Sequence, residues 1–317
     1  MSAAVEAEGI AKRYGAQVAL EDLTFTVAAG EIVGVLGPNG AGKTTAIRIL
    51  TTILQPDRGR FSIAGVACTE PARIRERVGV LPESAGYPER QRGEEYLRFH
   101  ARLFGHSRAS ARAVAGALLE EVGLAERGRW PIETYSRGMR QRLGIARALV
   151  NHPAVVFLDE PTLGLDPAGQ REILARVRAL AGERGTSVLL STHLLDEVEH
   201  NCSRVLILNR ARVVAEGTVG EIVRRAAEPR RARLRVPPEE VRRAVATLIG
   251  SGVAEEAAPA DGAAGGSLTV RLAPRAADAS LNAVVAVLLD AGVPLLAFEL
   301  EGARLSDAFL AVTAEVA

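Results

Sequence analysis

A glycine-rich loop between an apolar run and a helical pattern constrains the fold of this chain more than any other feature. Residues 37–45 read Gly-Pro-Asn-Gly-Ala-Gly-Lys-Thr-Thr and fit the pattern G-x-x-x-x-G-K-[ST]. Residues 31–36, before the loop, predict a buried strand, and Ile47, Leu50 and Leu54 after it have helical spacing. Strand, loop and helix in this order predict a phosphate-binding loop, with a plain glycine turn as the alternative.

The chemistry of phosphate binding explains the residue types in this loop. Its glycines let backbone N–H groups turn toward phosphate oxygens, and the helix that follows adds the positive end of its dipole. Lys43 can neutralise the β- and γ-phosphates, and the Thr44 hydroxyl can bind Mg²⁺. Lys12 and Lys43 are the only lysines of this arginine-rich chain, which favours a specific use of Lys43. The expected nucleotide contacts are Gly37, Pro38, Asn39, Gly40, Ala41, Gly42, Lys43, Thr44 and Thr45.

Composition narrows the class of protein. A chain of 317 residues suits one large domain or two ordinary ones, and a net charge of +1 gives no reason to expect a nucleic-acid partner. Cys68 and Cys202 do not form a disulfide framework and suit a reducing cytosol. Residues 1–9 do not resemble a signal peptide. The apolar stretch 281–300 is interrupted by polar and helix-breaking residues, so we expect no membrane span and a peripheral protein at most.

Alternating strand and helix patterns predict an α/β fold for residues 1–223. Buried strands are expected at 155–159 and 187–190, with an amphipathic helix at 173–180 between them. This alternation predicts a mainly parallel sheet, preceded by a small antiparallel β subdomain within residues 5–27. Residues 84–134, rich in Arg, Glu, Ala and Leu, predict an inserted helical subdomain that we place at about 84–150.

The composition changes near Arg224, where a second domain is expected at 224–317. Its predicted order is βαββαβ, a small α+β fold in which no catalytic cluster is visible. The expected elements are a strand at 232–236, a helix at 241–249, a strand at 253–257, a glycine loop at 261–266, a strand at 268–272, a helix at 281–289 and a strand at 293–300. A regulatory or dimer-supporting role is our hypothesis for this domain, with a passive appendage as the alternative.

Two further residue groups suggest roles at a nucleotide site. Asp159 and Glu160 end a predicted strand, where one carboxylate can hold Mg²⁺ and another can orient or deprotonate water. A solvated acidic turn is the alternative. Tyr14 lies in a predicted turn and could stack on a purine, or be an ordinary half-buried tyrosine.

An ordered set of motifs over residues 5–220 resembles the ATP-binding cassette ATPases. After the phosphate loop come Val-Gly-Val-Leu-Pro-Glu at 78–83, similar to the glutamine loop, and Tyr-Ser-Arg-Gly-Met-Arg-Gln-Arg at 135–142, similar to the signature motif. Asp-Glu-Pro-Thr at 159–162, an aspartate loop at 163–166 and a switch histidine, His193, complete the order. The resemblance implies a P-loop NTPase fold of this type and ATP with Mg²⁺ as cofactors.

The resemblance also implies roles for single residues. Tyr14 would stack on adenine, Thr44 and Asp159 would hold Mg²⁺, and Glu160 would be the general base. His193 would hydrogen-bond the γ-phosphate. Because such domains sandwich two ATP molecules head to tail, the resemblance implies a homodimer. In it, Ser136 and Gly138 would contact the nucleotide of the opposite subunit, and the aspartate-loop Asp166 is counted with them.

The chain departs from the common pattern at two motifs. Arg137 and Met139 replace a glycine and a glutamine of the commoner signature, while Ser136 and Gly138 are kept. Glu83 stands where the glutamine loop usually has glutamine, so we count it as a catalytic residue and as a metal ligand. These departures, with the ending Leu-Ser-Asp-Ala-Phe-Leu at 305–310, resemble the drug-exporter branch of the family.

The sequence therefore predicts an ATPase subunit that powers an exporter from the cytoplasmic side of the cell membrane, with a separate membrane-spanning permease. A cassette ATPase of DNA repair or of ribosomes is the alternative. A repair protein would need a long coiled coil after the phosphate loop, where Gly105, Gly116, Gly123 and Gly128 interrupt this chain, and ribosomal members usually carry two cassettes. A regulator without turnover is disfavoured by the presence of Glu160.

Overall fold

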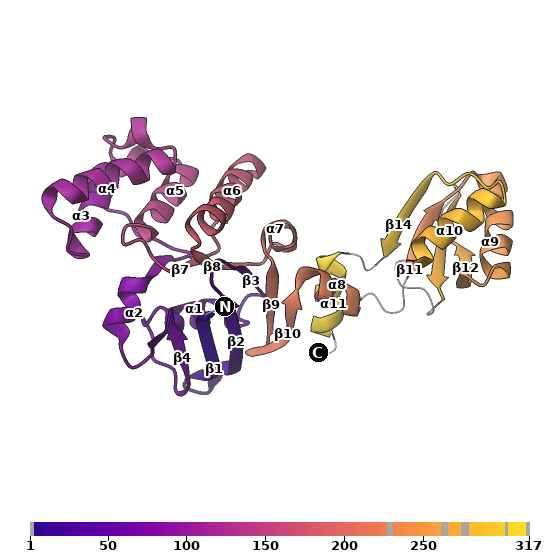
Figure 1. Ribbon diagram of the computed structural model, residues 1–317, viewed down its shortest axis with the longest axis horizontal. Helices are drawn as coiled ribbons and strands as arrows, with labels where there is room; N and C mark the ends of the chain where they lie inside the picture. The colour runs from indigo at the N-terminus through magenta and orange to yellow at the C-terminus, as the bar shows by residue number, and fades with distance from the viewer. Residues whose placement is uncertain (1–2, 227–230, 261–265, 274–278, 302–303, 315–317) are drawn as a thin grey trace. The chain divides into compact units, whose positions relative to one another are not determined.

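The computed structural model describes residues 3–226, 231–260, 266–273, 279–301 and 304–314. It divides the chain into two compact units, Met1–Val219 and Gly220–Ala317, which we describe separately (Figure 1). The boundary expected from the sequence lay between residues 223 and 224. Most of the glycine loop expected at 261–266 lies outside the described residues.

The described part of the first unit is built on a 10-stranded sheet with the order β5-β4-β1-β2-β10-β9-β3-β8-β7-β6. Strands β9, β3, β8, β7 and β6 pair in parallel, whereas β2, β1, β4 and β5 pair antiparallel. The predicted parallel core with an antiparallel β subdomain is thus confirmed. The strands are β1 Ala3–Tyr14, β2 Gln17–Ala28, β3 Ile32–Leu36, β4 Arg58–Ile63, β5 Val66–Ala67, β6 Val78–Leu81, β7 Val155–Asp159, β8 Ser187–Thr192, β9 Arg204–Asn209 and β10 Arg212–Thr218.

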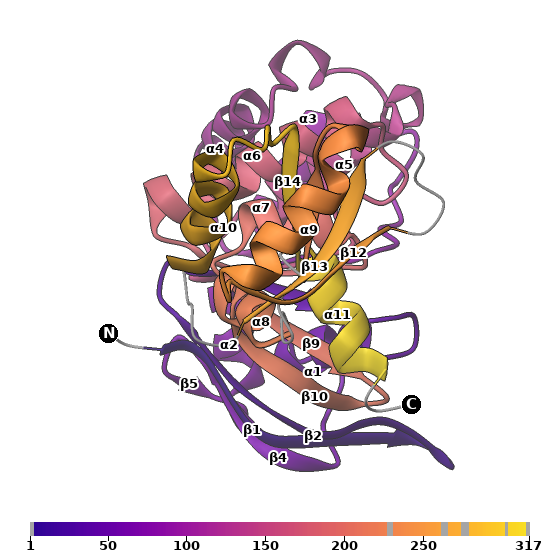
Figure 2. The same ribbon diagram turned by 90° about the vertical axis from the view of Figure 1, so that its right-hand side faces the viewer.

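Helices cover both faces of the parallel part of this sheet, as the apolar runs require. Every residue of β7 and β8 is buried, which is typical of parallel strands covered on both sides. Helix α1 lies on one side of the sheet and α6 and α7 lie on the other (Figures 1 and 2). The helices of this unit are α1 Lys43–Leu50, α2 Pro71–Arg77, α3 Gly93–Leu103, α4 Arg108–Glu121, α5 Arg137–Ala148, α6 Pro167–Arg184 and α7 Leu195–Asn201.

Helix α1 is held in place by a single large apolar core. Its Ile47 and Leu50 belong to the same buried cluster as Phe25 of β2 and Phe157 of β7. This cluster joins the antiparallel and parallel parts of the sheet around the helix. The start of α1, and the loop before it, are therefore fixed by packing on several strands.

Helices α4 and α6 of this unit each begin after a residue whose side chain caps the first turn. The Ser107 hydroxyl accepts a hydrogen bond from the Ser110 N–H and starts α4, and Asp166 does the same for the Gly169 N–H at the start of α6. Because of that cap, and of Pro167 in its first turn, α6 begins earlier than the predicted helix at 173–180. The inserted helical subdomain is confirmed as α3, α4 and α5.

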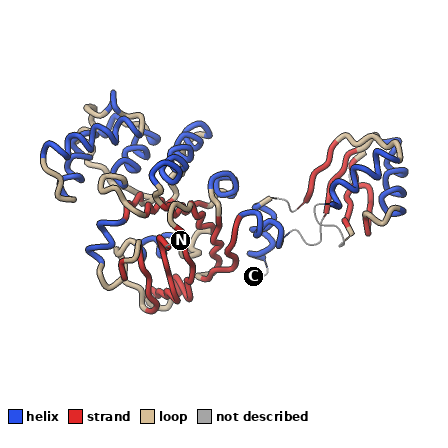
Figure 3. The backbone as a smooth tube through the Cα atoms, viewed as in Figure 1, coloured by secondary structure: helices blue, strands red, loops and turns tan. Residues whose placement is uncertain are grey.

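The second unit has a four-stranded antiparallel sheet with the order β12-β13-β11-β14. Helices α9 and α10 lie on one face of it (Figure 3). Ala232 and Leu234 of β11 point to this face, while Arg231, Arg233 and Arg235 are exposed. The elements, with α8 before the sheet and α11 after it, are α8 Val219–Ala226, β11 Arg231–Arg235, α9 Val241–Gly250, β12 Ala254–Pro259, β13 Ser267–Leu272, α10 Ala279–Asp290, β14 Ala297–Glu301 and α11 Leu305–Ala314.

This order confirms the βαββαβ pattern expected from the sequence. The apolar stretch at 281–300 is divided between α10 and β14, separated by a turn with Gly292 at a positive φ of 70°. Within the described residues, none of the helices combines the length and the apolar character that a membrane crossing needs.

The division into two units predicts that a core defect in the second leaves the first intact. Leu234 is 0% exposed, so Leu234→Ala should destabilise the second unit by about 2–5 kcal/mol. The only tryptophan, Trp130, lies in the first unit and reports its unfolding by fluorescence. We expect calorimetry to show a lower unfolding temperature for the second unit. The unfolding temperature that Trp130 fluorescence reports for the first unit should be unchanged.

Leu289→Ala is the matched control, because Leu289 in the same unit is 59% exposed and should cost little. A Trp130 transition that falls together with the second unit in Leu234→Ala would contradict the independence of the two units.

Candidate functional site

The phosphate loop requires glycine at two positions for reasons that the structure makes explicit. A Cβ at Gly37 would collide with the backbone carbonyl of Leu208 on β9. Gly42, the residue before α1, has a φ of 109°, and a Cβ there would lie 2.7 Å from a Leu20 methyl carbon. Close packing of the loop against β2 and β9 therefore fixes its curl.

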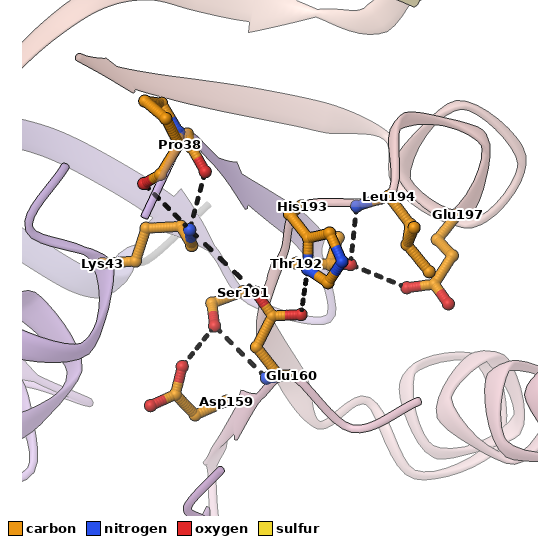
Figure 4. Close-up of polar contacts among 10 residues, drawn as sticks. Pro38, Lys43, Asp159, Glu160, Ser191, Thr192, His193, Leu194 and Glu197 are labelled. Atoms are coloured by element: carbon orange, nitrogen blue, oxygen red, sulfur yellow. Dashed lines mark hydrogen bonds and ion pairs between the residues drawn. The ribbon is translucent and has the colours of Figure 1, made fainter. Parts of the chain in front are cut away.

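Lys43 lies at the first position of α1 with its ammonium group turned back over the loop. Its Nζ donates to the Gly37 carbonyl at 2.6 Å and to the Pro38 carbonyl at 3.3 Å, and lies 4.0 Å from the Glu160 carboxylate (Figure 4). Only 7% of the residue is exposed. Burial lowers the pKa of Lys43, and the carboxyl groups of Glu160, Asp159 and Glu83 oppose that shift.

A cavity of about 680 Å³ opens above the loop and brings together residues from distant parts of the first unit. Tyr14, which is 46% exposed at the end of β1, lines it together with Glu83, which follows β6. The full lining is Tyr14, Gln17, Ala19, Pro38, Asn39, Gly40, Ala41, Gly42, Lys43, Thr44, Thr45, Glu83, Glu160, Leu163 and His193. Of these, Gln17, Ala19 and Leu163 were not among the expected site residues, although Leu163 belongs to the aspartate loop at 163–166.

Two carboxylates stand at the end of β7. Asp159 is 2% exposed, and its Oδ1 accepts a hydrogen bond of 2.5 Å from the Ser191 hydroxyl on β8. Glu160 is 8% exposed and has a φ of 49°, in the left-handed region that non-glycine residues seldom occupy. A hydrogen bond of 3.0 Å from its N–H to the Ser191 carbonyl holds this strained turn. The Glu160 side chain lines the cavity.

His193 completes the group of polar side chains at the cavity. Its Nδ1 forms a hydrogen bond of 2.8 Å with Glu160 Oε2, while Lys43 approaches Oε1 of the same carboxylate (Figure 4). The His193 side chain is 45% exposed, compared with 10% for Glu160. The carboxylate therefore lies between a buried ammonium and a half-exposed imidazole, and it lines the same cavity as the phosphate loop.

The signature and aspartate-loop residues lie in a different hollow of the same unit, of about 440 Å³. The Ser136 hydroxyl accepts a hydrogen bond of 3.2 Å from the Met139 N–H at the start of α5, and Asp166 caps α6. Gly138 lies beside them. Ser136, Gly138 and Asp166 are thus brought together with one another, and they do not line the cavity above the phosphate loop.

Arg137 contacts the aspartate loop of its own chain. Gly164 has a φ of 70°, and a Cβ there would collide with the Arg137 guanidinium. The arginine that replaces a signature glycine therefore packs over the neighbouring loop. Sequence reasoning recognised the replacement but had no means of locating the side chain.

The donor set fits a divalent cation that arrives with a nucleotide. In the described ranges, no three His, Cys, Asp or Glu side chains converge to hold a metal ion unaided. Thr44, Asp159 and Glu83 would offer hydroxyl and carboxylate oxygens, and Mg²⁺ characteristically takes its remaining ligands from water and substrate phosphates.

The fold, the glycine loop before α1 and the buried Glu160 carboxylate beside it define the class of the protein. It is a P-loop nucleotide-binding domain. Comparison with known proteins agrees. Residues 20–163 match the family model described as ABC transporter. The daunorubicin resistance ATP-binding protein of Streptomyces coeruleorubidus is 44% identical over 69% of this chain and 69% of its own length. The Nod factor export ATP-binding protein I of Paraburkholderia xenovorans is 40% identical over 70% of this chain and 73% of its own.

A solved ATP-binding subunit of an ABC transporter is also similar, with 36% identity and a TM-score of 0.63 over 70% of this chain and 92% of that one. The chain belongs to the ABC transporter family as one of its ATP-binding subunits, and it is an ATPase. The family resemblance and the fold class expected from the sequence are confirmed.

The buried position of Lys43 predicts that even arginine cannot replace it. A guanidinium is larger and planar, so Lys43→Arg should lower ATP affinity by roughly tenfold or more, from a packing cost of about 1–3 kcal/mol. Isothermal titration with a non-hydrolysable ATP analogue measures the loss. Lys12→Arg is the matched control, because Lys12 pairs with Asp57 and does not line the cavity. Equal affinities of Lys43→Arg and wild type would contradict this account of the loop.

Proposed function

We propose that this chain powers a membrane exporter whose permease is a separate chain, and that it works at the cytoplasmic side of the membrane as a peripheral subunit. The names of the two relatives support export rather than DNA repair or ribosome function, since one is named for daunorubicin resistance and the other for Nod factor export. Because the two differ in substrate at similar identity, we propose a drug-type substrate from the daunorubicin-resistance relative without naming a compound.

The observation that carries the proposed chemistry is the Glu160 carboxylate, held between Lys43 and His193 at the floor of the cavity. We assign Glu160 as the general base that takes a proton from the attacking water. His193 holds the Glu160 carboxylate and contacts the γ-phosphate. Lys43 and the loop N–H groups bind the β- and γ-phosphates, and Tyr14 stacks on the adenine.

We propose that Thr44 and Asp159 would hold Mg²⁺, with Glu83 as a further carboxylate. Thr44 and Glu83 line the cavity, whereas Asp159 is buried at the end of β7 and is not among the lining residues. When bound, Mg²⁺ neutralises charge on the phosphate oxygens. The Ser191 hydroxyl donates to one oxygen of Asp159, and we propose that the other oxygen of that carboxylate would hold the ion or its water. We propose that Glu83 adds charge to this site in place of the neutral glutamine of other members.

The general-base assignment predicts a mutant that binds ATP without turning it over. Glu160→Gln should keep ATP affinity and lower hydrolysis by about 10²–10⁴-fold, because an amide cannot accept the proton of the attacking water. Glu76→Gln, an exposed glutamate on α2, is the matched control. Phosphate release and analogue binding are measured on the same preparations. Hydrolysis by Glu160→Gln within threefold of wild type would remove Glu160 from this role.

We further propose that two copies of the chain share their sites. Ser136 and Gly138 lie in a separate hollow from the phosphate loop of their own chain, and the N-terminus of α5 with the Ser136 hydroxyl can face an anion. In a head-to-tail homodimer this hollow would cover the nucleotide of the other copy. The second unit, Gly220–Ala317, is proposed to support dimerisation or regulation.

Site sharing predicts complementation between two inactive variants. Ser136→Ala damages the site of the partner, whereas Lys43→Ala damages the site of its own chain. A mixture should therefore contain heterodimers with one intact site and recover ATPase activity above either variant alone. The heterodimer fraction is measured by native mass spectrometry. Absence of recovery in mixtures that contain heterodimers would contradict a shared site.

A further inference from the structure

Three consecutive residues at the end of β8 each contact a different carboxyl group. Ser191 donates to Asp159, and His193 hydrogen-bonds Glu160, so both belong to the site already described. Thr192, between them, points to the opposite side and donates a hydrogen bond of 2.9 Å to Glu197 Oε2 (Figure 4). Thr192 is 0% exposed and Glu197 is 6% exposed, and neither has a role in the chemistry proposed above.

The direction of these hydrogen bonds follows from the donors available. The Leu194 N–H donates to the Thr192 hydroxyl oxygen at 3.0 Å, so that oxygen acts as the acceptor. The single hydroxyl proton is then left for the Glu197 carboxyl group. Glu197 consequently orients the hydroxyl that binds the Leu194 amide, and removing either partner leaves a buried polar group unpaired.

His193 is the middle residue of the closed turn that these bonds create. The Thr192 side chain is attached to the backbone before His193 and binds the N–H after it, so the turn fixes the peptide groups on both sides. Because the His193 side chain is 45% exposed, neighbouring atoms constrain the imidazole less than a buried ring, and the backbone largely sets its direction. Rotation of this turn would move Nδ1 away from the Glu160 carboxylate.

Glu197 is itself held firmly by α7. Its carbonyl accepts a hydrogen bond of 2.6 Å from Asn201, whose side chain in turn bonds Arg178 of α6. The next residue, Val198, packs so closely on β3 that a Cβ at Gly34 would lie 2.6 Å from it. Strand β3 leads directly into the phosphate loop, so the loop and the turn that carries His193 share one support.

Burying the carboxyl group of Glu197 costs stability that holding the helix in place does not require. Its Oε1 has no hydrogen-bond partner among the described residues, although it is buried. An unsatisfied buried acceptor typically costs about 1–3 kcal/mol, which an apolar side chain would avoid. Stability alone therefore does not account for an acid at this position, whereas its bond to Thr192 does.

We infer that Glu197 and Thr192 are positioning residues for ATP hydrolysis, which set the direction of His193 toward Glu160 without touching the nucleotide. This inference rests on the proposed function of His193 and Glu160. Under this inference the two hydroxyls at the end of β8 have different roles. Ser191 holds Asp159, whereas Thr192, oriented by Glu197, sets the direction of His193.

The first test compares variants that keep or remove the hydrogen bonds. Thr192→Val and Glu197→Leu should lower kcat by about 10- to 100-fold, since a small misplacement of a catalytic group has effects of that order. Affinity for a non-hydrolysable ATP analogue should stay within threefold of wild type. Thr192→Ser keeps the hydroxyl and should restore kcat to within threefold. Asp196→Asn, exposed on the same helix, is the matched control.

The second test asks whether Glu197 acts through His193. In a His193→Ala background, Glu197→Leu should cause no further loss of kcat, because the group that it positions is gone. A merely structural defect would lower kcat by the same factor in both backgrounds. Melting temperatures of all variants are recorded, and the effect on stability should be the same with and without His193.

The outcomes separate this inference from the function on which it rests. If His193→Ala lowers kcat but Thr192→Val and Glu197→Leu do not, the positioning role is wrong and the assignment of His193 stands. If Glu197→Leu lowers kcat equally in both backgrounds, Glu197 does not act through His193. If His193→Ala and Glu160→Gln both hydrolyse ATP normally, the proposed function fails, and the inference fails with it.

Discussion

The parallel register of β3, β8 and β7 is the constraint on which the site depends. Leu36, the last residue before the phosphate loop, is opposite Thr192, and Asp159 is opposite Ser191. The carboxyl ends of these strands therefore meet at one edge of the sheet, where open α/β sheets bind their ligands. A slip of one residue in β8 would exchange the directions of Ser191 and Thr192 and separate both from their carboxyl groups.

The polar groups that this register brings together contact one carboxylate, that of Glu160. It is reached by an ammonium from α1 and an imidazole from the end of β8, while its own backbone lies in a strained conformation after β7. Each contact comes from a different element, so the arrangement depends on the whole core around α1. Under the proposed function, the strain and the burial of Lys43 are costs that the fold carries in order to hold the group beside a phosphate.

Much of this could be predicted from the sequence, because the deciding signals are local. The glycines of the phosphate loop lie close together in the sequence, as do the apolar run of β7 and the acids Asp159 and Glu160 at its end, and each group appears in the structure at its expected place. The βαββαβ order of the second unit follows from local periodicity in the same way. The helix predicted from the apolar repeat was shorter than α6. The start of α6 is set by the Asp166 cap, which lies outside that repeat.

The rest could not be predicted because it depends on pairing between distant segments. Nothing near Ser191 in the sequence indicates that β8 lies beside β7. The hydrogen bond from Ser191 to Asp159 therefore could not be predicted. The contact of Arg137 with Gly164 likewise requires the positions of two loops in space. A buried acid such as Glu197 resembles any exposed helix glutamate until its surroundings are known.

The most direct test of the central claim is a single-turnover experiment on the purified full chain. Chain in excess of ATP is mixed with Mg²⁺, and the bound nucleotide is quenched and analysed over time. The account predicts that bound ATP is converted to ADP and phosphate, because Glu160, His193 and the phosphate loop are already assembled at one edge of the sheet. Bound ATP that stays intact on the wild-type chain would contradict it.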